Sequence, residues 1–427
     1  MSEKPNEMKI VIIYGKAGCG KTTKMIEMMR SMKKYMVLAP TNAAVENIYT
    51  LSAEAFGKAP KREKYKTIYS FFRIDYENNI VAGAVFYPKI LFIDEFGLMD
   101  KHLFKRCLLM AEEGGVEMVV MSGDVMQLNP IYRSKQKVSF NKLKELNQMW
   151  QALEPGEKAE KLIYPSVAEH LQLSIFGSRK VLTKAQLIPL TTNKRANDTT
   201  KEVLKNIYIA NEKFPYEWVE FFDLARLIFD EGYIFIASKY KILQHVFDMI
   251  YEARLKDMNA VVINQAQIGT KLGYKRLYLL PNSGIITCQT VKGEYINGQE
   301  LIFTGEEDPS GLKCINPQTE EIVHVHKDTD KFGHEYYPIT PAYLLSVHKS
   351  QGRSIDKVIV CVDGMFDISM LYTAITRTKT KLMFYSKEGQ ENRVKALIDA
   401  AFVDEFKQLN IMTQHLAQTL KAIKPRK

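Results

Sequence analysis

The 427-residue sequence lacks several features that would assign it to a class at once. Its apolar runs, such as 90–93 and 118–121, are far shorter than the roughly 20 residues of a membrane-spanning helix. The first residues contain no apolar stretch typical of a signal peptide. Its five cysteines are odd in number and form no C-x-x-C pair, which argues against a disulfide framework or a zinc site. We therefore expect an intracellular, cytoplasmic protein with no membrane partner, located in the host cell if it is viral or phage-encoded.

Basic residues, in contrast, are in excess. The sequence has 59 Lys and Arg against 49 Asp and Glu, which gives a formal net charge of +10 at pH 7. Such an excess favours a polyanionic partner such as nucleic acid, although surface lysines also serve solubility alone. The length allows two or three domains, each with a core of its own.

A complete phosphate-binding loop lies near the start of the chain, at residues 15–22. It follows an apolar run, Ile10–Tyr14, and precedes a helical pattern, Thr23–Met32. In this context the backbone N–H groups of the loop and the helix N-terminus surround a polyphosphate. Lys21 would neutralise the β- and γ-phosphates, and the Thr22 hydroxyl would bind Mg²⁺. The expected nucleotide contacts are Gly15, Ala17, Gly18, Cys19, Gly20, Lys21, Thr22 and Thr23.

Two further apolar runs end in polar side chains that suit nucleotide hydrolysis. Asp94 and Glu95 follow the run 90–93. At the carboxyl edge of a parallel sheet, Asp94 can hold Mg²⁺ and Glu95 can orient or deprotonate the attacking water. Gln127 follows the run 118–121, and its neutral amide can sense a γ-phosphate without repelling it.

The order of apolar runs predicts an α/β protein. Strand-like runs at 9–14, 35–39, 89–93, 116–121 and 187–190 alternate with helical patterns, which is typical of a parallel sheet covered on both faces. A second set follows at 233–237, 260–263, 344–347, 357–362 and 381–385. We expect two domains, 1–190 and 191–427, with a lysine-rich helical insertion at 131–186 in the first. Short alternating strands with turn signals at 270–340 predict a small antiparallel module inserted in the second.

The motifs as a set resemble those of superfamily 1 helicases, on the RecD/Dda-like branch that translocates 5′→3′. The resemblance covers nearly the whole chain in the family's order: Val37–Ala44, Lys66–Ser70, Asp94–Glu95, Gly123–Pro130, Leu190–Arg195, Ser346–Gly352 and Leu371–Thr378. It implies two RecA-like P-loop domains, with a small β-barrel inserted in the second at 270–340.

The resemblance also implies roles for individual residues. Arg195 and Arg377 would act as arginine fingers beside the catalytic residues Lys21, Glu95 and Gln127, and Gly352 would contact the nucleotide. Thr41, Asn42, Thr67, Ser70, Ser346 and His348 would contact a single strand, although each alone is better explained as a helix cap or turn residue. Ser238 would be a further backbone contact. Relatives carry a duplex-splitting pin where this chain has residues 74–88. Phe86 or Tyr87 is the candidate wedge, and a plain connecting hairpin explains the segment equally well.

Two departures from the family bear on specificity. Residues 1–8 are too few for the upstream glutamine helix that reads adenine in relatives, so the nucleotide is ATP or another NTP. Tyr69 stands where relatives commonly have histidine.

The expected function is an NTP-dependent DNA helicase that uses Mg²⁺ and moves on single-stranded DNA toward duplex junctions. We expect a monomer that works with replication or recombination proteins, in DNA replication or repair. Two alternatives stay open. One is a nucleic-acid-stimulated NTPase that binds or remodels nucleic acid without processive unwinding, and the other is a viral-type RNA helicase.

Overall fold

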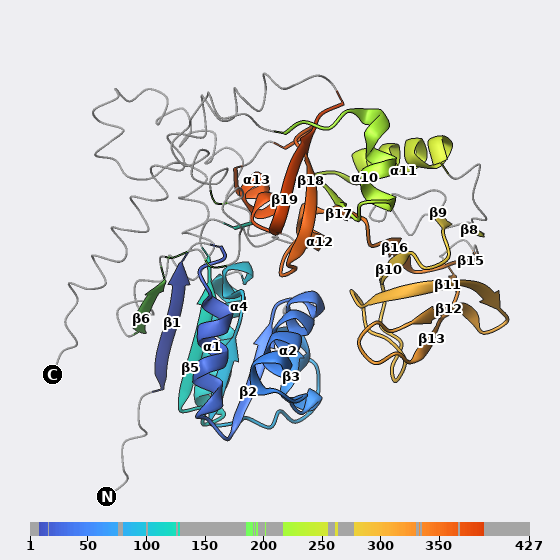
Figure 1. The fold of residues 1–427 in the computed structure, drawn as a ribbon. Helices are drawn as coiled ribbons and strands as arrows, with labels where there is room; N and C mark the ends of the chain where they lie inside the picture. Colours follow the sequence, from blue (N-terminus) through green and yellow to red (C-terminus); the bar gives the residue numbers. More distant parts are fainter. Residues whose placement is uncertain are drawn as a thin grey trace, which may run out of the picture. The chain divides into compact units, whose positions relative to one another are not determined.

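The computed structural model describes residues 8–15, 17–75, 80–99, 101–124, 127–128, 185–190, 192, 194, 201, 217–254, 261–263, 277–329, 333, 335–365 and 368–387. The chain divides into two compact units (Figure 1). The first unit contains Met1–Ala196, and the second contains Lys213–Lys395. The predicted helical insertion 131–186 lies outside the described residues except for its last two positions, and the chain after residue 387 lies outside them entirely.

The first unit is built on a six-stranded sheet with the order β3-β2-β4-β5-β1-β6. Every neighbouring pair in it is parallel. The strands are β1 (Lys9–Gly15), β2 (Tyr35–Ala39), β3 (Tyr65–Thr67), β4 (Ile90–Ile93), β5 (Met118–Gly123) and β6 (Ala185–Leu190). The helices are α1 (Lys21–Arg30), α2 (Asn42–Phe56), η1 (Arg62–Lys64), α3 (Ile68–Phe72), η2 (Phe96–Leu98) and α4 (Lys101–Glu113).

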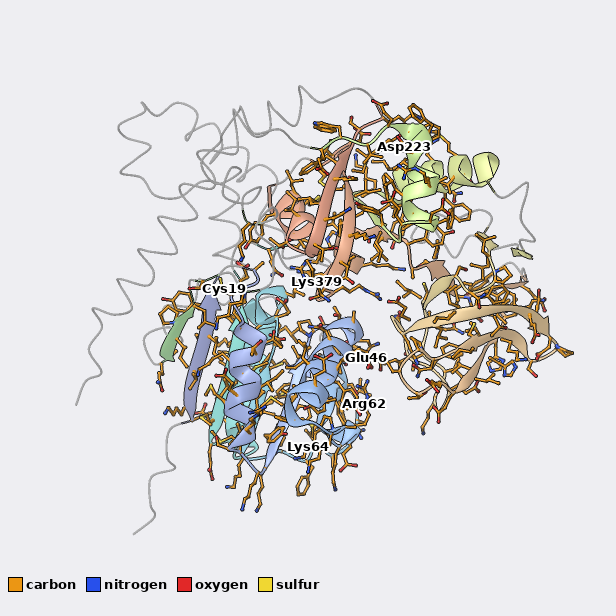
Figure 2. All side chains as sticks on the ribbon, in the orientation of Figure 1. Cys19, Glu46, Arg62, Lys64, Asp223 and Lys379 are labelled. Carbon is orange, nitrogen blue, oxygen red and sulfur yellow. The ribbon has the colours of Figure 1, made fainter. Side chains whose placement is uncertain are left out.

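Side-chain alternation along the strands divides the apolar residues of this unit between two cores. On β1, Val11 and Ile13 pack with α1 and α2, whereas Ile10 and Ile12 face the side covered by α3 and α4. Both faces are apolar because successive strand residues point to opposite sides and helices cover both. Among the surface contacts, Arg62 of η1 pairs with Glu46 of α2 (Figure 2).

The second unit contains a four-stranded parallel sheet with the order β17-β7-β18-β19. Its strands are β7 (Ile234–Ala237), β17 (Leu344–Ser346), β18 (Ile355–Cys361) and β19 (Thr378–Tyr385). Its helices are η4 (Phe221–Asp223), α10 (Leu224–Phe229), α11 (Tyr240–Arg254), α12 (Val347–Ser350) and α13 (Ile368–Ile375).

The sequence predicts one strand of this sheet that the structure shows in a different sheet. The run 260–263 forms β8 (Val261–Ile263), which pairs antiparallel with β9 (Leu277–Leu279) in a separate two-stranded ladder. A run of three or four apolar residues has strand character but does not specify its partner.

The expected antiparallel module is a five-stranded sheet with the order β13-β12-β11-β10-β16. Its strands are β10 (Gly284–Thr287), β11 (Glu300–Asp308), β12 (Gly311–Ile315), β13 (Ile322–Val325) and β16 (Ile339–Pro341), with β14 (Asp328–Thr329) and β15 (Glu335–Tyr336) as a small side ladder. Its side chains Ile285, Leu301 and Phe303 belong to the same buried cluster as Phe235 and Tyr385 of the parallel sheet. The edge strands β13 and β16 share no ladder within the described residues, so closure into a barrel stays a prediction.

Candidate nucleotide site and nucleic-acid contacts

Three neighbouring strands of the first unit bring the predicted catalytic residues to one edge. The strands β4, β5 and β1 are adjacent and parallel, so the loops that follow them lie at the same carboxyl edge. Those loops carry Lys21, Asp94 and Asp124. The sequence predicted a role for the first two, and the structure adds the third.

The phosphate-binding loop needs glycine at two positions for different reasons. Gly20 has φ 81 and is the N-cap of α1, which is a left-handed conformation that side chains disfavour. A Cβ atom on Gly15 would lie 2.2 Å from the carbonyl oxygen of Leu190 on β6, so only glycine allows this approach. Cys19 is buried within the loop (Figure 2), where a modifying reagent would disturb the loop backbone.

Lys21 is held at the loop by two oxygen partners. Its Nζ donates a hydrogen bond to the Gly15 carbonyl at 2.9 Å and lies 4.0 Å from Oδ2 of Asp124. Both side chains are buried, which strengthens their attraction relative to a surface pair. Asp124 therefore helps to fix the lysine that is predicted to meet the phosphates. The sequence contained the signal for it, a Gly-Asp pair after an apolar run, without giving it a role.

Asp94 connects the strand end to the phosphate-binding loop. Its Oδ2 accepts a hydrogen bond from the Thr22 hydroxyl at 3.0 Å, and its Oδ1 accepts from the backbone N–H of Glu95 at 3.0 Å and from the Ser122 hydroxyl. Glu95 has φ 51, an unusual value for a residue with a side chain. This backbone turn separates the two carboxylates directly after β4, and strain of this kind is common at functional sites.

The oxygen atoms of Thr22 and Asp94 suit a magnesium ion. Mg²⁺ prefers oxygen ligands and is usually held by one or two protein groups together with substrate phosphates and water. Among the described residues no cluster of three or more His, Cys, Asp or Glu side chains is arranged to hold a metal by itself. The Thr22 and Asp94 oxygens therefore fit an ion that arrives with a nucleotide.

Gln127 is buried at 4 % exposure, and its Oε1 atom has no hydrogen-bond partner. A buried amide oxygen without a partner costs about 1–3 kcal/mol. That position after β5 is consistent with the predicted contact to a ligand, which stays a prediction.

Arg377 lies at the amino edge of the second sheet, between α13 and β19. It is almost fully buried, and its Nε donates to the Thr373 carbonyl at 3.0 Å while Nη2 donates to the Thr376 hydroxyl at 3.2 Å. Its guanidinium is thus oriented by its own unit. Arg195, the other predicted arginine finger, lies outside the described residues.

Three polar atoms in the same region have no hydrogen-bond partner: Nε2 of Gln351, Nε of Arg353 and Oγ1 of Thr378. The first two flank Gly352, which has φ 78 and was the predicted nucleotide contact of this segment. Sequence reasoning did not single out these three, because only the folded chain shows which donors lack an acceptor.

Several predicted single-strand contacts serve as helix caps. The hydroxyls of Thr41, Thr67 and Ser346 accept from backbone N–H groups at the starts of α2, α3 and α12. A cap of this kind stabilises a helix by about 1 kcal/mol, which is a structural role in its own right. Asn42 opens α2, and Ser70 on α3 and His348 on α12 are exposed. The Ser238 hydroxyl donates to the Asp363 carbonyl at 3.2 Å. Contact with nucleic acid stays a prediction for all of them.

The predicted pin segment, 74–88, has little ladder structure. Within its described part the only pairing is an isolated bridge between Ile74 and Ile80. Phe86 is 94 % exposed, whereas the ring of Tyr87 packs edge-on against Phe71 with the centroids 5.8 Å apart. Of the two candidate wedge residues, only Phe86 is free to meet a partner.

Comparison with known protein families gives two matches. Residues 5–159 match a family described as an AAA domain, and residues 341–385 match the UvrD-like helicase C-terminal domain. A curated relative, the ATP-dependent DNA helicase Pif1 of Campylobacter jejuni, is 22 % identical over 417 residues that cover 86 % of each chain.

Solved structures give the same result for the fold. A Pif1 helicase structure that concerns unwinding at forked double-stranded DNA aligns with a TM-score of 0.55 and 20 % identity, over 89 % of this chain and 88 % of that one. The Pif1 helicase of Bacteroides in complex with ADP-AlF3 and single-stranded DNA aligns with a TM-score of 0.53 and 20 % identity, over 89 % of both chains. The fold is that of two RecA-like domains, as the sequence predicted.

Proposed function

We propose that this chain, a superfamily 1 helicase of the Pif1/RecD-like type, hydrolyses ATP or another NTP to move 5′→3′ on single-stranded DNA and unwind duplex. The observation that carries the proposal is the cluster at the carboxyl edge of the first sheet. There a glycine loop, the buried pair Lys21–Asp124 and the bonded pair Thr22–Asp94 come together. This set binds and polarises a triphosphate, and it has no use in a protein that only binds nucleic acid.

Each residue of the cluster has a part in the proposed reaction. Lys21 lies against the β- and γ-phosphates, and Glu95 orients the attacking water or takes its proton. Arg377 and Arg195 meet the negative charge that spreads over the phosphoryl oxygens in the transition state, where a planar guanidinium binds two oxygens at once. Arg377 belongs to the second unit, whereas Lys21 belongs to the first. Contact of Arg377 with the phosphates would therefore couple hydrolysis to a movement of one unit relative to the other.

Thr22 and Asp94 would hold the Mg²⁺ that accompanies the nucleotide. When bound, the ion neutralises phosphate charge and helps to orient the triphosphate. The unpartnered donors of Gln351, Arg353 and Thr378 support a further anionic contact near Gly352, because phosphate oxygens would supply the acceptors that they lack.

Single-stranded DNA and duplex junctions are the proposed nucleic-acid partners. The relatives support this choice, since one is a DNA helicase and another was solved with single-stranded DNA. The net charge of +10 supports a polyanion. Work as a monomer alongside replication or recombination proteins in a cytoplasm is part of the same proposal.

Strand displacement from tailed duplexes tests the proposal. One duplex carries a 5′ single-stranded tail and the other a 3′ tail, and Lys21→Ala serves as the inactive control. We expect displacement from the 5′ tail alone and none with Lys21→Ala. Displacement from the 3′ tail alone would overturn the polarity. Hydrolysis that DNA stimulates without any displacement would support an NTPase that only remodels or binds, and stimulation by RNA but not by DNA would support an RNA helicase.

A further inference from the structure

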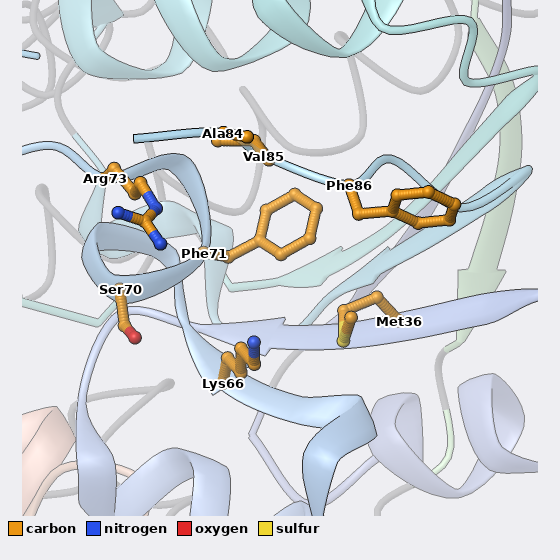
Figure 3. A pocket seen from close by; sticks show the side chains of 8 residues that line it. All are labelled: Met36, Lys66, Ser70, Phe71, Arg73, Ala84, Val85 and Phe86. Carbon is orange, nitrogen blue, oxygen red and sulfur yellow. The ribbon is translucent and has the colours of Figure 1, made fainter. Parts of the chain in front are cut away.

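A pocket of about 540 Å³ opens on the first unit, beside the edge strand β3. Its lining includes Met36, Lys66, Ser70, Phe71, Arg73 and Phe86 (Figure 3). The volume is within the range of small-ligand sites. In Figure 3, Phe86 and Met36 lie on one side of the pocket and Arg73 on the other, with Lys66 between them.

The backbone around the pocket is held in place by Arg73. This residue ends α3 with φ 52, its carbonyl accepts from the N–H of Val81 at 2.7 Å, and its Nη1 donates to the Ala82 carbonyl at 3.1 Å. Gly83, beside that same Nη1, has φ 134, a backbone conformation that residues with a side chain rarely adopt. The following Tyr87 is anchored against Phe71 and Phe72. Phe86 is therefore presented outward by a braced segment.

The chemistry of the lining combines cations with apolar surface. Within the described residues neither Lys66 nor Arg73 forms an ion pair with a carboxylate. The exposed ring of Phe86 and the Met36 side chain offer a face on which a flat ring can stack, and the Ser70 hydroxyl is a hydrogen-bond donor. Positive charge next to an open aromatic face is the combination that binds an unpaired nucleotide.

The position of the pocket indicates which strand would supply the nucleotide. The predicted contacts Thr41, Asn42 and Thr67 follow β2 and β3 at the carboxyl edge of the sheet. Met36 lies near the start of β2, and Lys66 shares a sheet face with it because Leu38 is the register partner of Lys66. The pocket lies on the flank of the sheet, and of the predicted single-strand contacts Thr41, Asn42, Thr67 and Ser70 its lining includes Ser70 alone.

We propose that this pocket receives an unpaired nucleotide of the displaced strand at a DNA fork, with its base on Phe86 and Met36 and its phosphate near Lys66 and Arg73. The inference rests on the proposed DNA helicase function and deepens it. It differs from the wedge expected at Phe86, because a wedge stacks on the last base pair, whereas the pocket holds a base that has already left the duplex.

Fluorescence of 2-aminopurine in a DNA fork tests the proposal with the full chain and no nucleotide. The probe is placed in one of three positions: the first unpaired position of the displaced strand, the first unpaired position of the other strand, or the last base pair. Stacking on an aromatic ring quenches the probe. We expect quenching on the displaced strand, and we expect Phe86→Ala to remove it and to weaken binding of the fork by about 5-fold or more. Phe222→Ala, which removes a 78 % exposed ring from the second unit, is the matched control.

Charge at the pocket is tested by Lys66→Ala against Lys58→Ala, an exposed lysine of the same unit outside the pocket lining. We expect only Lys66→Ala to lower fork affinity and to reduce its salt dependence by roughly one phosphate contact. Quenching only in the last base pair, or only on the other strand, would overturn the proposal that the pocket binds the displaced strand. Unchanged binding and quenching in both Phe86→Ala and Lys66→Ala would overturn it as well. Binding of a plain DNA single strand to the unmutated protein is measured in parallel. If the unmutated protein does not bind it, the proposed function itself fails.

Discussion

The two parallel sheets of this protein use their edges in different ways. The first sheet gathers its loop, its acids and its predicted strand contacts at one carboxyl edge. The second sheet has Arg377 and Arg353 at its amino edge, where the Arg377 carbonyl accepts a hydrogen bond from the N–H of the first residue of β18. At its carboxyl edge lie Ser238, Ser346 and Asp363. The seven residues of β18 separate these edges by roughly 20 Å.

Each sheet also has a buried aspartate after a central strand, and the two have different partners. Asp94 bonds the Thr22 hydroxyl of the phosphate-binding loop. The Asp363 carboxylate accepts from the Ser386 hydroxyl at 2.6 Å and from the Lys387 N–H at 2.7 Å, so it ties the end of β18 to the end of β19. Burial raises the pKa of the neighbouring Cys361 thiol, and the Asp363 carboxylate adds to that rise. The same residue type is thus predicted to serve the nucleotide in one unit, whereas in the other it joins two strand ends.

The largest effect is expected from the amino edge of the second sheet. Arg377→Ala should slow hydrolysis by roughly 10³-fold or more, the usual value of an arginine finger. Arg377→Lys should recover little, since an ammonium lacks the planar pair of donors. Steady-state phosphate release measures both, and Arg226→Ala, on the surface of the same unit, is the control. Near-normal hydrolysis by folded Arg377→Ala would make this arginine purely structural and would break the contrast between the two edges.

At the first sheet, Glu95→Gln should lower the hydrolysis rate by roughly 10²–10⁴-fold while nucleotide binding persists, because the amide cannot accept a proton. Single-turnover hydrolysis and equilibrium binding of a labelled nucleotide separate the two effects. Glu113→Gln, at the exposed end of α4, is the matched control. Retained hydrolysis in Glu95→Gln would exclude Glu95 as the base.

Ser122→Ala tests the support of Asp94. Removing the hydroxyl that bonds Oδ1 of Asp94 should raise the Mg²⁺ concentration needed for half-maximal hydrolysis by about 10-fold, because groups that orient a metal-binding carboxylate tune its affinity. Ser31→Ala, whose hydroxyl bonds only the Met28 carbonyl at the end of α1, should leave that concentration unchanged. An unshifted Mg²⁺ titration in Ser122→Ala would argue against Asp94 as the metal contact.

The smallest effect is expected for Asp363→Asn. It should cost about 1–2 kcal/mol of unfolding free energy and lower Tm by a few degrees, while the folded protein hydrolyses NTP at the normal rate. Calorimetry measures the first and phosphate release the second. Asp356→Asn, an exposed residue paired with Lys379 at 3.5 Å, should change neither. If Asp363→Asn abolished hydrolysis without lowering Tm, the two aspartates would be functionally alike.

The sequence predicted the strands that form the sheets because their apolar runs are long and are bounded by polar residues. It missed β3, which has three residues, and it placed 260–263 in the wrong sheet, because short runs carry no information on pairing. The acids after β4 could be predicted since they stand directly at a strand end. The partners of Asp94 and Lys21 could not, because Ser122 and Asp124 come from a strand 28 or more residues further along the chain.

A backbone hydrogen bond ties the phosphate-binding loop to the chain that follows β6. The N–H of Lys194, four residues after the end of β6, donates to the Gly18 carbonyl at 2.7 Å. A rearrangement of the loop on binding or release of a triphosphate would therefore change this hydrogen bond and the position of Lys194. The exchange rate of the Lys194 amide proton, measured with and without nucleotide, would report such a change.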